Sequence, residues 1–274
     1  MGQLKKIGII GAGNMGSAII AGVIRQKLLE PNGIFVYDID ETKVSRLSEE
    51  LGVCTAISIA EVAKYCSTII LSVKPQHLDQ VFAELRDLLN EGHLLISIAA
   101  GISLDHLKKA AAYRCSVIRT MPNIAALVGE GITSICKDRA VEPQCLETAR
   151  MIFSTLGRVE FIEESQIHGA TAIAGSSPAL AFQFIEALAD GGVMMGLPRQ
   201  QSLTMAAQAL LGAARLYLET GKHPGELKDM VCSPGGTTIE AVASLEYNGF
   251  RGMVIKAVKV CAEKSERLGR NNEK

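Results

Sequence analysis

The sequence predicts an N-terminal α/β domain of the Rossmann type, with a doubly wound and mainly parallel sheet, followed by an all-α C-terminal domain. Three observations lead to this prediction. Apolar strand patterns alternate with helical patterns over the first ~160 residues, strand patterns stop after about Glu164, and a glycine-rich turn follows the first strand. The expected domain boundaries are 1–163 for the α/β domain and 164–274 for the helical domain.

Six apolar segments of the first domain have the pattern of strands. Several of them are apolar on both faces, as expected for parallel strands that helices cover on each side. The segments are KIGII (6–10), IFVYD (34–38), TIILSV (68–73), HLLISIA (93–99), SVIRT (116–120) and GITSIC (131–136). Amphipathic stretches such as 41–51 and 76–89 lie between them, so the repeated β–α units predict a parallel sheet.

Proline and glycine residues at expected helix ends divide the second domain into a series of helices. One helix is expected to open at Pro198 and close at Gly221, a second to run over 237–249, and the last to run from about 250 to near Gly269, with a polar, frayed tail over 270–274. These helices are crowded with Ala and Gly, and small residues let helices approach closely. Because the helices are so apolar, we expect them to bury further surface in a homodimer or a larger homo-oligomer.

Composition argues against several functional classes. Hydrophobic residues make up 48% of the chain and aromatic residues only 4%, so the core is expected to be aliphatic. The net charge of −1 gives no indication of a nucleic-acid or membrane-surface role, and the longest apolar runs have the length of strands rather than membrane spans. Seven dispersed cysteines without a CxxC predict reduced thiols in a cytoplasmic protein, and the five histidines show no metal-ligand spacing.

The turn after the first strand carries the fingerprint of a dinucleotide site. The segment IGIIGAGNMG (7–16) has the pattern GxGxxG at Gly11, Gly13 and Gly16, between a strand and a helix. Gly11 is expected to allow the tight turn, Gly13 to let a pyrophosphate approach the backbone, and Gly16 to let the helix pack on the strand. The helix N-terminus would face the phosphates.

Asp38, at the end of the second predicted strand, bears on the choice of cofactor. A carboxylate there can accept hydrogen bonds from a ribose 2′-hydroxyl and would repel a 2′-phosphate, which favours NADH over NADPH. Lys43 and Arg46 follow closely and could partly restore NADPH binding. In the alternative interpretation, Asp38 only caps the next helix, with Glu41 completing a capping box.

Two further strand ends are expected to reach the cofactor. Pro75 in SVKPQ (72–76) forces a turn at the carboxyl edge of the sheet, which would direct Lys74 over the cleft, although a solvated lysine is the alternative. The small residues of IAAG (98–101) would leave room for the nicotinamide ribose. The candidate cofactor-binding residues are Gly11, Ala12, Gly13, Asn14, Met15, Gly16, Asp38, Val73, Lys74, Pro75, Ala99 and Ala100.

Six motifs in order identify a family resemblance. They are GAGNMG, SVKPQ, IAAG, RTMPN (119–123), DGGVMMGLP (190–198) and VCSPGGTTIEA (231–241). Together they resemble pyrroline-5-carboxylate reductase, over essentially the whole chain, and the SPGGTT stretch is the most specific of them. The resemblance implies reduction of 1-pyrroline-5-carboxylate to L-proline with hydride from NADPH or NADH, and a dimer formed by intertwined C-terminal helices. It also implies that the substrate lies between the nicotinamide and the loop 233–238, with Thr238 as the partner of the imine nitrogen.

The residues of this loop support a carboxylate site on their own. The loop precedes an expected helix, whose free backbone N–H groups can bind a carboxylate, and glycines allow close approach. A protonated imine needs little acid catalysis, so an orienting hydroxyl is enough. The alternative is an ordinary turn with a hydroxyl N-cap. The candidate substrate-binding residues are Ser233, Gly235, Gly236, Thr237 and, from a second motif, Ser176.

That second motif, IAGSSPAL (173–180), departs from the family pattern LSGSGPAY. Ala174, Ser177 and Leu180 replace a serine, a glycine and a tyrosine, and Met230 stands where an asparagine is frequent. These changes could alter the substrate or the rate. His168, one turn earlier, is either a pocket residue or a helix-surface histidine.

Three other functions compete with this interpretation. β-Hydroxyacid dehydrogenases share the architecture but use a lysine of the first long C-terminal helix, and this chain has no lysine between Lys137 and Lys222. A related reductase of another cyclic imine is compatible with the altered motif, since small pocket changes alter ring-size discrimination. A catalytically weak, dinucleotide-binding paralogue is supported only by the motif departures.

Overall fold

The chain forms two compact units. The computed structural model describes residues 4–272. Unit 1 contains the chain up to Ser176 and again from Cys261, and unit 2 contains Ser177–Val260. This division by contacts falls later than the boundary expected at 163/164, since the short helices after the last strand contact β7 and the end of the last helix also belongs to unit 1.

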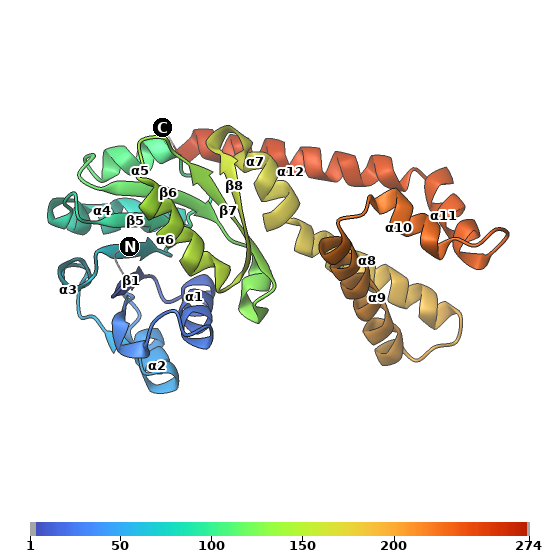
Figure 1. The fold of residues 1–274 in the computed structure, drawn as a ribbon, viewed down its shortest axis with the longest axis horizontal. Coiled ribbons are helices and arrows are strands. Elements are labelled where there is room, and N and C mark those ends of the chain that lie inside the picture. The colour runs from blue at the N-terminus through green and yellow to red at the C-terminus, as the bar shows by residue number, and fades with distance from the viewer. Residues whose placement is uncertain (1–3, 273–274) are drawn as a thin grey trace. The chain divides into compact units, whose positions relative to one another are not determined.

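Unit 1 is built on an eight-stranded sheet (Figure 1). Its order is β3-β2-β1-β4-β5-β6-β7-β8, and every neighbouring pair is parallel except β6 and β7. The mainly parallel, doubly wound sheet is thus confirmed. The strands are β1 (Ile7–Ile10), β2 (Ile34–Tyr37), β3 (Cys54–Thr55), β4 (Thr68–Leu71), β5 (Leu94–Ser97), β6 (Ser116–Met121), β7 (Gly131–Lys137) and β8 (Gly157–Glu163).

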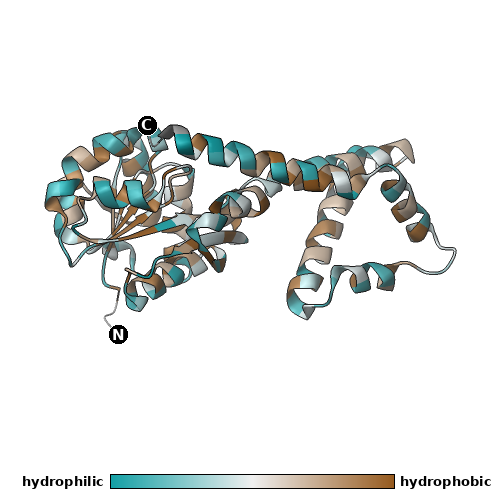
Figure 2. Ribbon diagram, turned by 90° about the horizontal axis from the view of Figure 1, so that it is seen from above, coloured by the Kyte–Doolittle hydropathy of each residue, from teal (hydrophilic) through white to brown (hydrophobic). Residues whose placement is uncertain are grey.

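Helices cover both faces of this sheet and create two apolar cores. One core includes buried residues of α1, α2 and α6, and the other includes those of α3, α4 and α5. The strands between them are largely hydrophobic (Figure 2). The helices of unit 1 before its last segment are α1 (Asn14–Arg25), α2 (Glu41–Leu51), α3 (Ile59–Tyr65), α4 (Leu78–Leu85), α5 (Leu104–Ala110), α6 (Pro143–Ser154) and α7 (Ile167–Ala170).

Unit 2 consists of helices, as the sequence predicts. They are α8 (Ser177–Met194), α9 (Arg199–Thr220), α10 (Pro224–Val231), α11 (Thr237–Tyr247) and the first half of α12 (Phe250–Asn272), whose second half belongs to unit 1. Gly221 closes α9 in the left-handed region, with φ +63. The expectation that the last helix ends near Gly269 is wrong, because Gly269 lies inside α12, which continues to Asn272. Residues 270–272 of the expected frayed tail are therefore helical, and residues 273 and 274 lie outside the described part of the chain.

Apolar side chains are exposed along unit 2 of a single chain. In α8, Ala189 is the one buried residue of 18. By length and composition alone, the helical stretch Glu164–Met194 is also apolar enough to cross a membrane, contrary to the expectation from run length. These two criteria do not distinguish a membrane helix from one that packs on another protein surface.

Candidate functional site

The glycine loop between β1 and α1 has the geometry that the fingerprint predicts. Gly11 has φ +108, and a Cβ there would lie 2.5 Å from the carbonyl oxygen of Ser72 on the neighbouring strand end. A Cβ on Gly16 would lie 2.1 Å from the carbonyl oxygen of Gly11. Both positions therefore require glycine, one for the backbone turn and one for the contact between helix and loop.

Gly13 differs from the other two glycines. A Cβ built on it meets no atom within 4 Å, and the residue is exposed at the N-cap of α1. Packing within the chain therefore does not explain a glycine here, whereas close approach of a ligand phosphate does. Ser72, below the loop, contributes a buried hydroxyl that has no hydrogen-bond partner among the described residues. Ser72 was not among the predicted site residues, and its place in SVKPQ, beside Val73 and Lys74, is the one signal in the sequence that could have indicated it.

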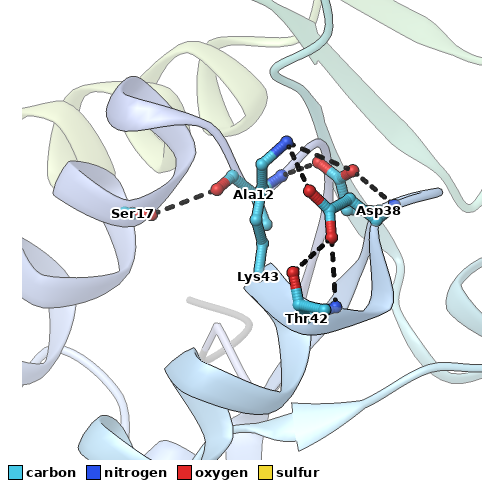
Figure 3. A network of polar contacts seen from close by, with 6 residues as sticks. Ala12, Ser17, Asp38, Thr42 and Lys43 are labelled. Atoms are coloured by element: carbon cyan, nitrogen blue, oxygen red, sulfur yellow. Dashed lines mark hydrogen bonds and ion pairs between the residues drawn. The ribbon is translucent and has the colours of Figure 1, made fainter.

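Asp38 is hydrogen-bonded to the backbone of the glycine loop. Its Oδ2 accepts a hydrogen bond of 2.7 Å from the backbone N–H of Ala12, and its Oδ1 accepts one of 2.9 Å from the N–H of Asp40 (Figure 3). The helix cap is a different residue: Asp40 is the N-cap of α2 and accepts from Thr42. The alternative that Asp38 merely caps α2 is therefore wrong.

The charged side chains around Asp38 give this part of the cavity wall a net negative charge. Lys43 places its Nζ 3.2 Å from Asp40 Oδ2 and 4.0 Å from Asp38 Oδ1, so one ammonium group faces two carboxylates (Figure 3). Hydrogen bonds from Thr42 and then from Lys43 hold the pKa of Asp40 below its ordinary value, so this carboxylate is ionised at neutral pH. Arg46 is exposed on α2 and does not line the adjoining cavity.

A cavity of about 510 Å³ joins these groups at the carboxyl edge of the sheet. The volume is ordinary for a site that holds a small ligand. Of the predicted cofactor residues, Gly11, Gly13, Asp38, Val73 and Lys74 line it. Ile39, which is 86% exposed, lies in the same wall and offers an apolar surface that sequence reasoning did not single out. The cavity and its glycine loop fit a dinucleotide.

The other predicted cofactor residues do not line this cavity. Asn14 is exposed as the first residue of α1, whereas Met15 packs against a hydrophobic core. Pro75 begins a short 3-10 turn after Lys74. After β5, Ala99 is buried, with its N–H bonded to Ser97, and Ala100 is exposed.

A π-helical turn over Thr171–Gly175 adds a second feature to unit 1. The N–H of Ser176 bonds to the carbonyl of Thr171, and π turns occur often at functional sites. Asn123, the last residue of RTMPN, is buried and donates from Nδ2 to the Ala174 carbonyl at 3.0 Å. The structure thereby joins two motifs that are far apart in the sequence. Ser176 Oγ accepts a contact of 3.1 Å from the Cys261 thiol.

The SPGGTT loop lies in unit 2 and precedes α11. The N-cap of α11 is Gly236, and no side chain caps the helix. The alternative of a hydroxyl N-cap is therefore wrong, and the N–H groups of the first turn are open to a ligand. Gly235 has φ +67, and a Cβ on Gly236 would lie 2.3 Å from Ser233 Oγ. The remaining candidates, Thr237 and Thr238, are the first two residues of α11.

Two of the four departures from the family pattern, Ala174 and Ser177, lie around the start of α8, and the other two lie at exposed positions of unit 2. Ala174 participates through its backbone carbonyl, which a serine would offer equally, and Ser177 begins α8. Leu180 and Met230 lie in unit 2 with 36% and 65% of their surface exposed. No described contact of their side chains explains the substitutions.

Two protein families match parts of the chain. The family described as pyrroline-5-carboxylate reductase dimerisation matches residues 164–268, and the family described as NADP oxidoreductase, coenzyme F420-dependent, matches residues 6–101. The first match begins at Glu164, the first residue of the expected helical domain.

Curated proteins and solved structures are similar over nearly the whole chain. Pyrroline-5-carboxylate reductase of Escherichia coli is 47% identical over 97% of this chain and 99% of its own length, and that of Methanosarcina acetivorans is 42% identical over 97% and 98%. The reductase structure from Coxiella burnetii has a TM-score of 0.92 at 32% identity, covering 97% of this chain and 98% of its own. The Plasmodium falciparum structure, with NADP bound, has a TM-score of 0.85 at 31% identity, covering 97% and 99%.

Proposed function

The chain belongs to the pyrroline-5-carboxylate reductase family, and we propose that it reduces 1-pyrroline-5-carboxylate to L-proline, the last step of proline biosynthesis. The single observation that carries the proposal is the similarity to these reductases through both units. In the reaction, a hydride forms a C–H bond at the imine carbon and the electron pair of the C=N bond moves to nitrogen. Starting from the protonated imine, the product is the neutral ring amine, which takes up a proton from solvent.

A nicotinamide dinucleotide supplies the hydride when it is bound. The open backbone at Gly13 and the N-terminus of α1 would hold its pyrophosphate, and Asp38 would accept from its adenosine ribose. Lys74 reaches the same cavity as a cation. We assign the remaining candidates, Ala12, Asn14, Met15, Gly16, Val73, Pro75, Ala99 and Ala100, to backbone contacts and to shaping the cleft around the cofactor.

We further propose that NADH is preferred over NADPH. A ribose 2′-phosphate would meet two carboxylates, Asp38 and Asp40, whose one nearby cation is Lys43. The dianionic phosphate gains little from an ammonium group that already faces two carboxylates, whereas a 2′-hydroxyl can donate to Asp38.

The SPGGTT loop is our candidate for the substrate site. The free N–H groups at the start of α11, with the hydroxyl groups of Ser233 and Thr237, would bind the carboxylate, and Gly235 and Gly236 would let it approach. Thr238 would orient the imine nitrogen by a hydrogen bond, and Ser176 would add a contact from the second motif. These residues would mainly position the imine, and positioning supplies much of the rate.

The match to a dimerisation family supports a homo-oligomer, and we propose a homodimer as its smallest form. The apolar side chains that unit 2 exposes in a single chain fit burial against a second copy. We place the protein in the cytoplasm, since its seven cysteines are all free.

The test is oxidation of NADH and of NADPH, followed at the nicotinamide absorbance, with 1-pyrroline-5-carboxylate as substrate. We expect turnover with both and a higher kcat/KM for NADH. A higher kcat/KM for NADPH would support the proposed reaction but contradict the role given to Asp38. Folded protein that binds dinucleotide but turns over neither would contradict the proposed activity, and six-membered cyclic imines would then be the substrates to try.

A further inference from the structure

Among the cavities of unit 1 is a small one that shares no residue with the dinucleotide cavity. Its volume is about 200 Å³. Four segments form its walls: the loop between β5 and α5, strand β6, helix α7 and the end of α12. The lining residues are Gly101, Ser103, Arg119, His168, Glu266, Gly269 and Arg270.

Arg119 gives this cavity a buried cation. The residue is 6% exposed, and its Nη1 donates a hydrogen bond of 2.8 Å to Glu164 Oε1. A guanidinium has five N–H donors, and no other side-chain hydrogen bond joins Arg119 to the described residues. The remaining N–H groups of this guanidinium are not sealed within the protein, since the residue lines the cavity, and they can donate to an acceptor bound there.

Other donors face the same space, while the nearby carboxylates are already engaged. His168 bonds to Ser265 Oγ through Nδ1 at 2.9 Å, so its Nε2 is available to the cavity, and Ser103 Oγ accepts from the His106 N–H and keeps its own proton. Among the acceptors, Glu164 also receives the N–H of Leu104. Glu266 receives Arg270 Nη2 at 2.6 Å. Donors of Arg119, His168 and Ser103 therefore face the cavity, and each of the two carboxylates is paired with an arginine.

The end of α12 forms one wall of this cavity. A Cβ on Gly269 would lie 3.6 Å from His168 Cε1, and this glycine has no positive φ. That distance is an ordinary van der Waals contact, so the last turns of α12 lie close to α7 although the position does not require a glycine.

We propose that this cavity binds a small oxyanion, a phosphate or a carboxylate, held by Arg119 with further hydrogen bonds from His168 and Ser103. Arginine presents parallel N–H groups that match the geometry of both anions. Burial, and then Arg119, lower the pKa of His168, so its imidazole is neutral near pH 7 and contributes an N–H rather than a charge. The bound anion would link β6, α7 and the end of α12.

The experiment is a titration of the full-length protein with inorganic phosphate at constant pH, with saturating NADH present to occupy the dinucleotide site. The readout is the NMR signal of the His168 imidazole, assigned by its loss in His168→Asn. We expect a saturable shift. Arg270→Gln, at an exposed lining position, should weaken the apparent affinity roughly 3- to 10-fold. The matched control is Arg267→Gln, which removes the same charge from an exposed position of α12 outside the cavity, and it should leave the affinity unchanged.

The titration is repeated with acetate in place of phosphate. Whichever of the two anions has the higher apparent affinity shows whether the cavity prefers a phosphate or a carboxylate. Sodium chloride at equal ionic strength should not reproduce the shift. The proposal is overturned if neither probe shifts the His168 signal saturably, if chloride gives the same shift, or if the Arg267 and Arg270 variants weaken binding equally.

Discussion

Asp38 has two tasks at the wall of the dinucleotide cavity. It accepts a hydrogen bond from the N–H of Ala12, which fixes the glycine loop, and in the proposed cofactor complex it contributes negative charge beside the ribose. The residue types alone predicted the second task. They did not predict the first, because a hydrogen bond between residues 12 and 38 depends on how β1 and β2 pair. For the same reason, the sequence suggested Asp38 as a helix cap, whereas α2 is capped by Asp40.

The variant Asp38→Asn tests the charge at this wall. Its amide oxygen can still accept from the N–H of Ala12, so the glycine loop should keep its form, although the amide NH2 cannot accept from the N–H of Asp40 as the carboxylate does. Repulsion of a 2′-phosphate falls because the negative charge is removed. We expect the ratio of kcat/KM for NADH over NADPH to drop about 10-fold, equivalent to about 1.4 kcal/mol. Glu41→Gln is the control, since it removes a nearby carboxylate that does not line the cavity. An unchanged ratio in Asp38→Asn, or an equal change in both variants, would contradict the assignment.

At the scale of elements, the ends of a helix were predictable where a capping residue or a glycine in the sequence determines them. Helix α2 runs over the expected Glu41–Leu51, because Asp40 caps its start and Gly52 follows its end in the left-handed region. Strand β8 was missed because GRVEFIE mixes charged and apolar residues, and its place is fixed by parallel pairing with β7. The end of α12 was misjudged because Gly269 has no positive φ and lies within the helix, which continues to Asn272.

Asn123 connects elements in a way that no local pattern reveals. Its Oδ1 accepts from the N–H of Ile132 at 3.1 Å, and its Nδ2 donates to the Ala174 carbonyl, so one buried amide joins the end of β6, strand β7 and the π turn. Asn123→Ala leaves two backbone groups without partners, at a cost of about 1–3 kcal/mol each. We expect the Tm to fall by roughly 5–10 °C in a thermal scan at fixed protein concentration.

The control for Asn123 is Asn90→Ala. Asn90 accepts from the N–H of Gly92 in an exposed turn, so the expected change in Tm is at most about 2 °C. If both variants lowered the Tm equally, the role of Asn123 as a link between elements would be refuted.

At the scale of the molecule, unit 2 has little core of its own. Helix α9 buries only Ser202 and Ala206, and no described residue of α11 or α12 is buried. The apolar composition of these helices predicted a need for further burial. It did not predict which faces meet, because periodicity is weak in helices that are apolar on several sides.

The requirement for a second chain can be tested with one pair of variants on α9. Leu211 is 55% exposed, and Gln208 is an exposed polar residue one turn away on the same helix. Leu211→Glu would place a charge in an apolar interface, whereas Gln208→Glu adds the same charge to a polar position. In sedimentation velocity we expect the unmodified chain and Gln208→Glu to have at least twice the mass of one 29.2 kDa chain. Leu211→Glu should shift toward the mass of a single chain on dilution, with exposed apolar surface detected by dye binding. A stable, folded single chain in the unmodified protein at micromolar concentration would refute the inference, since unit 2 would then hold its form without a partner.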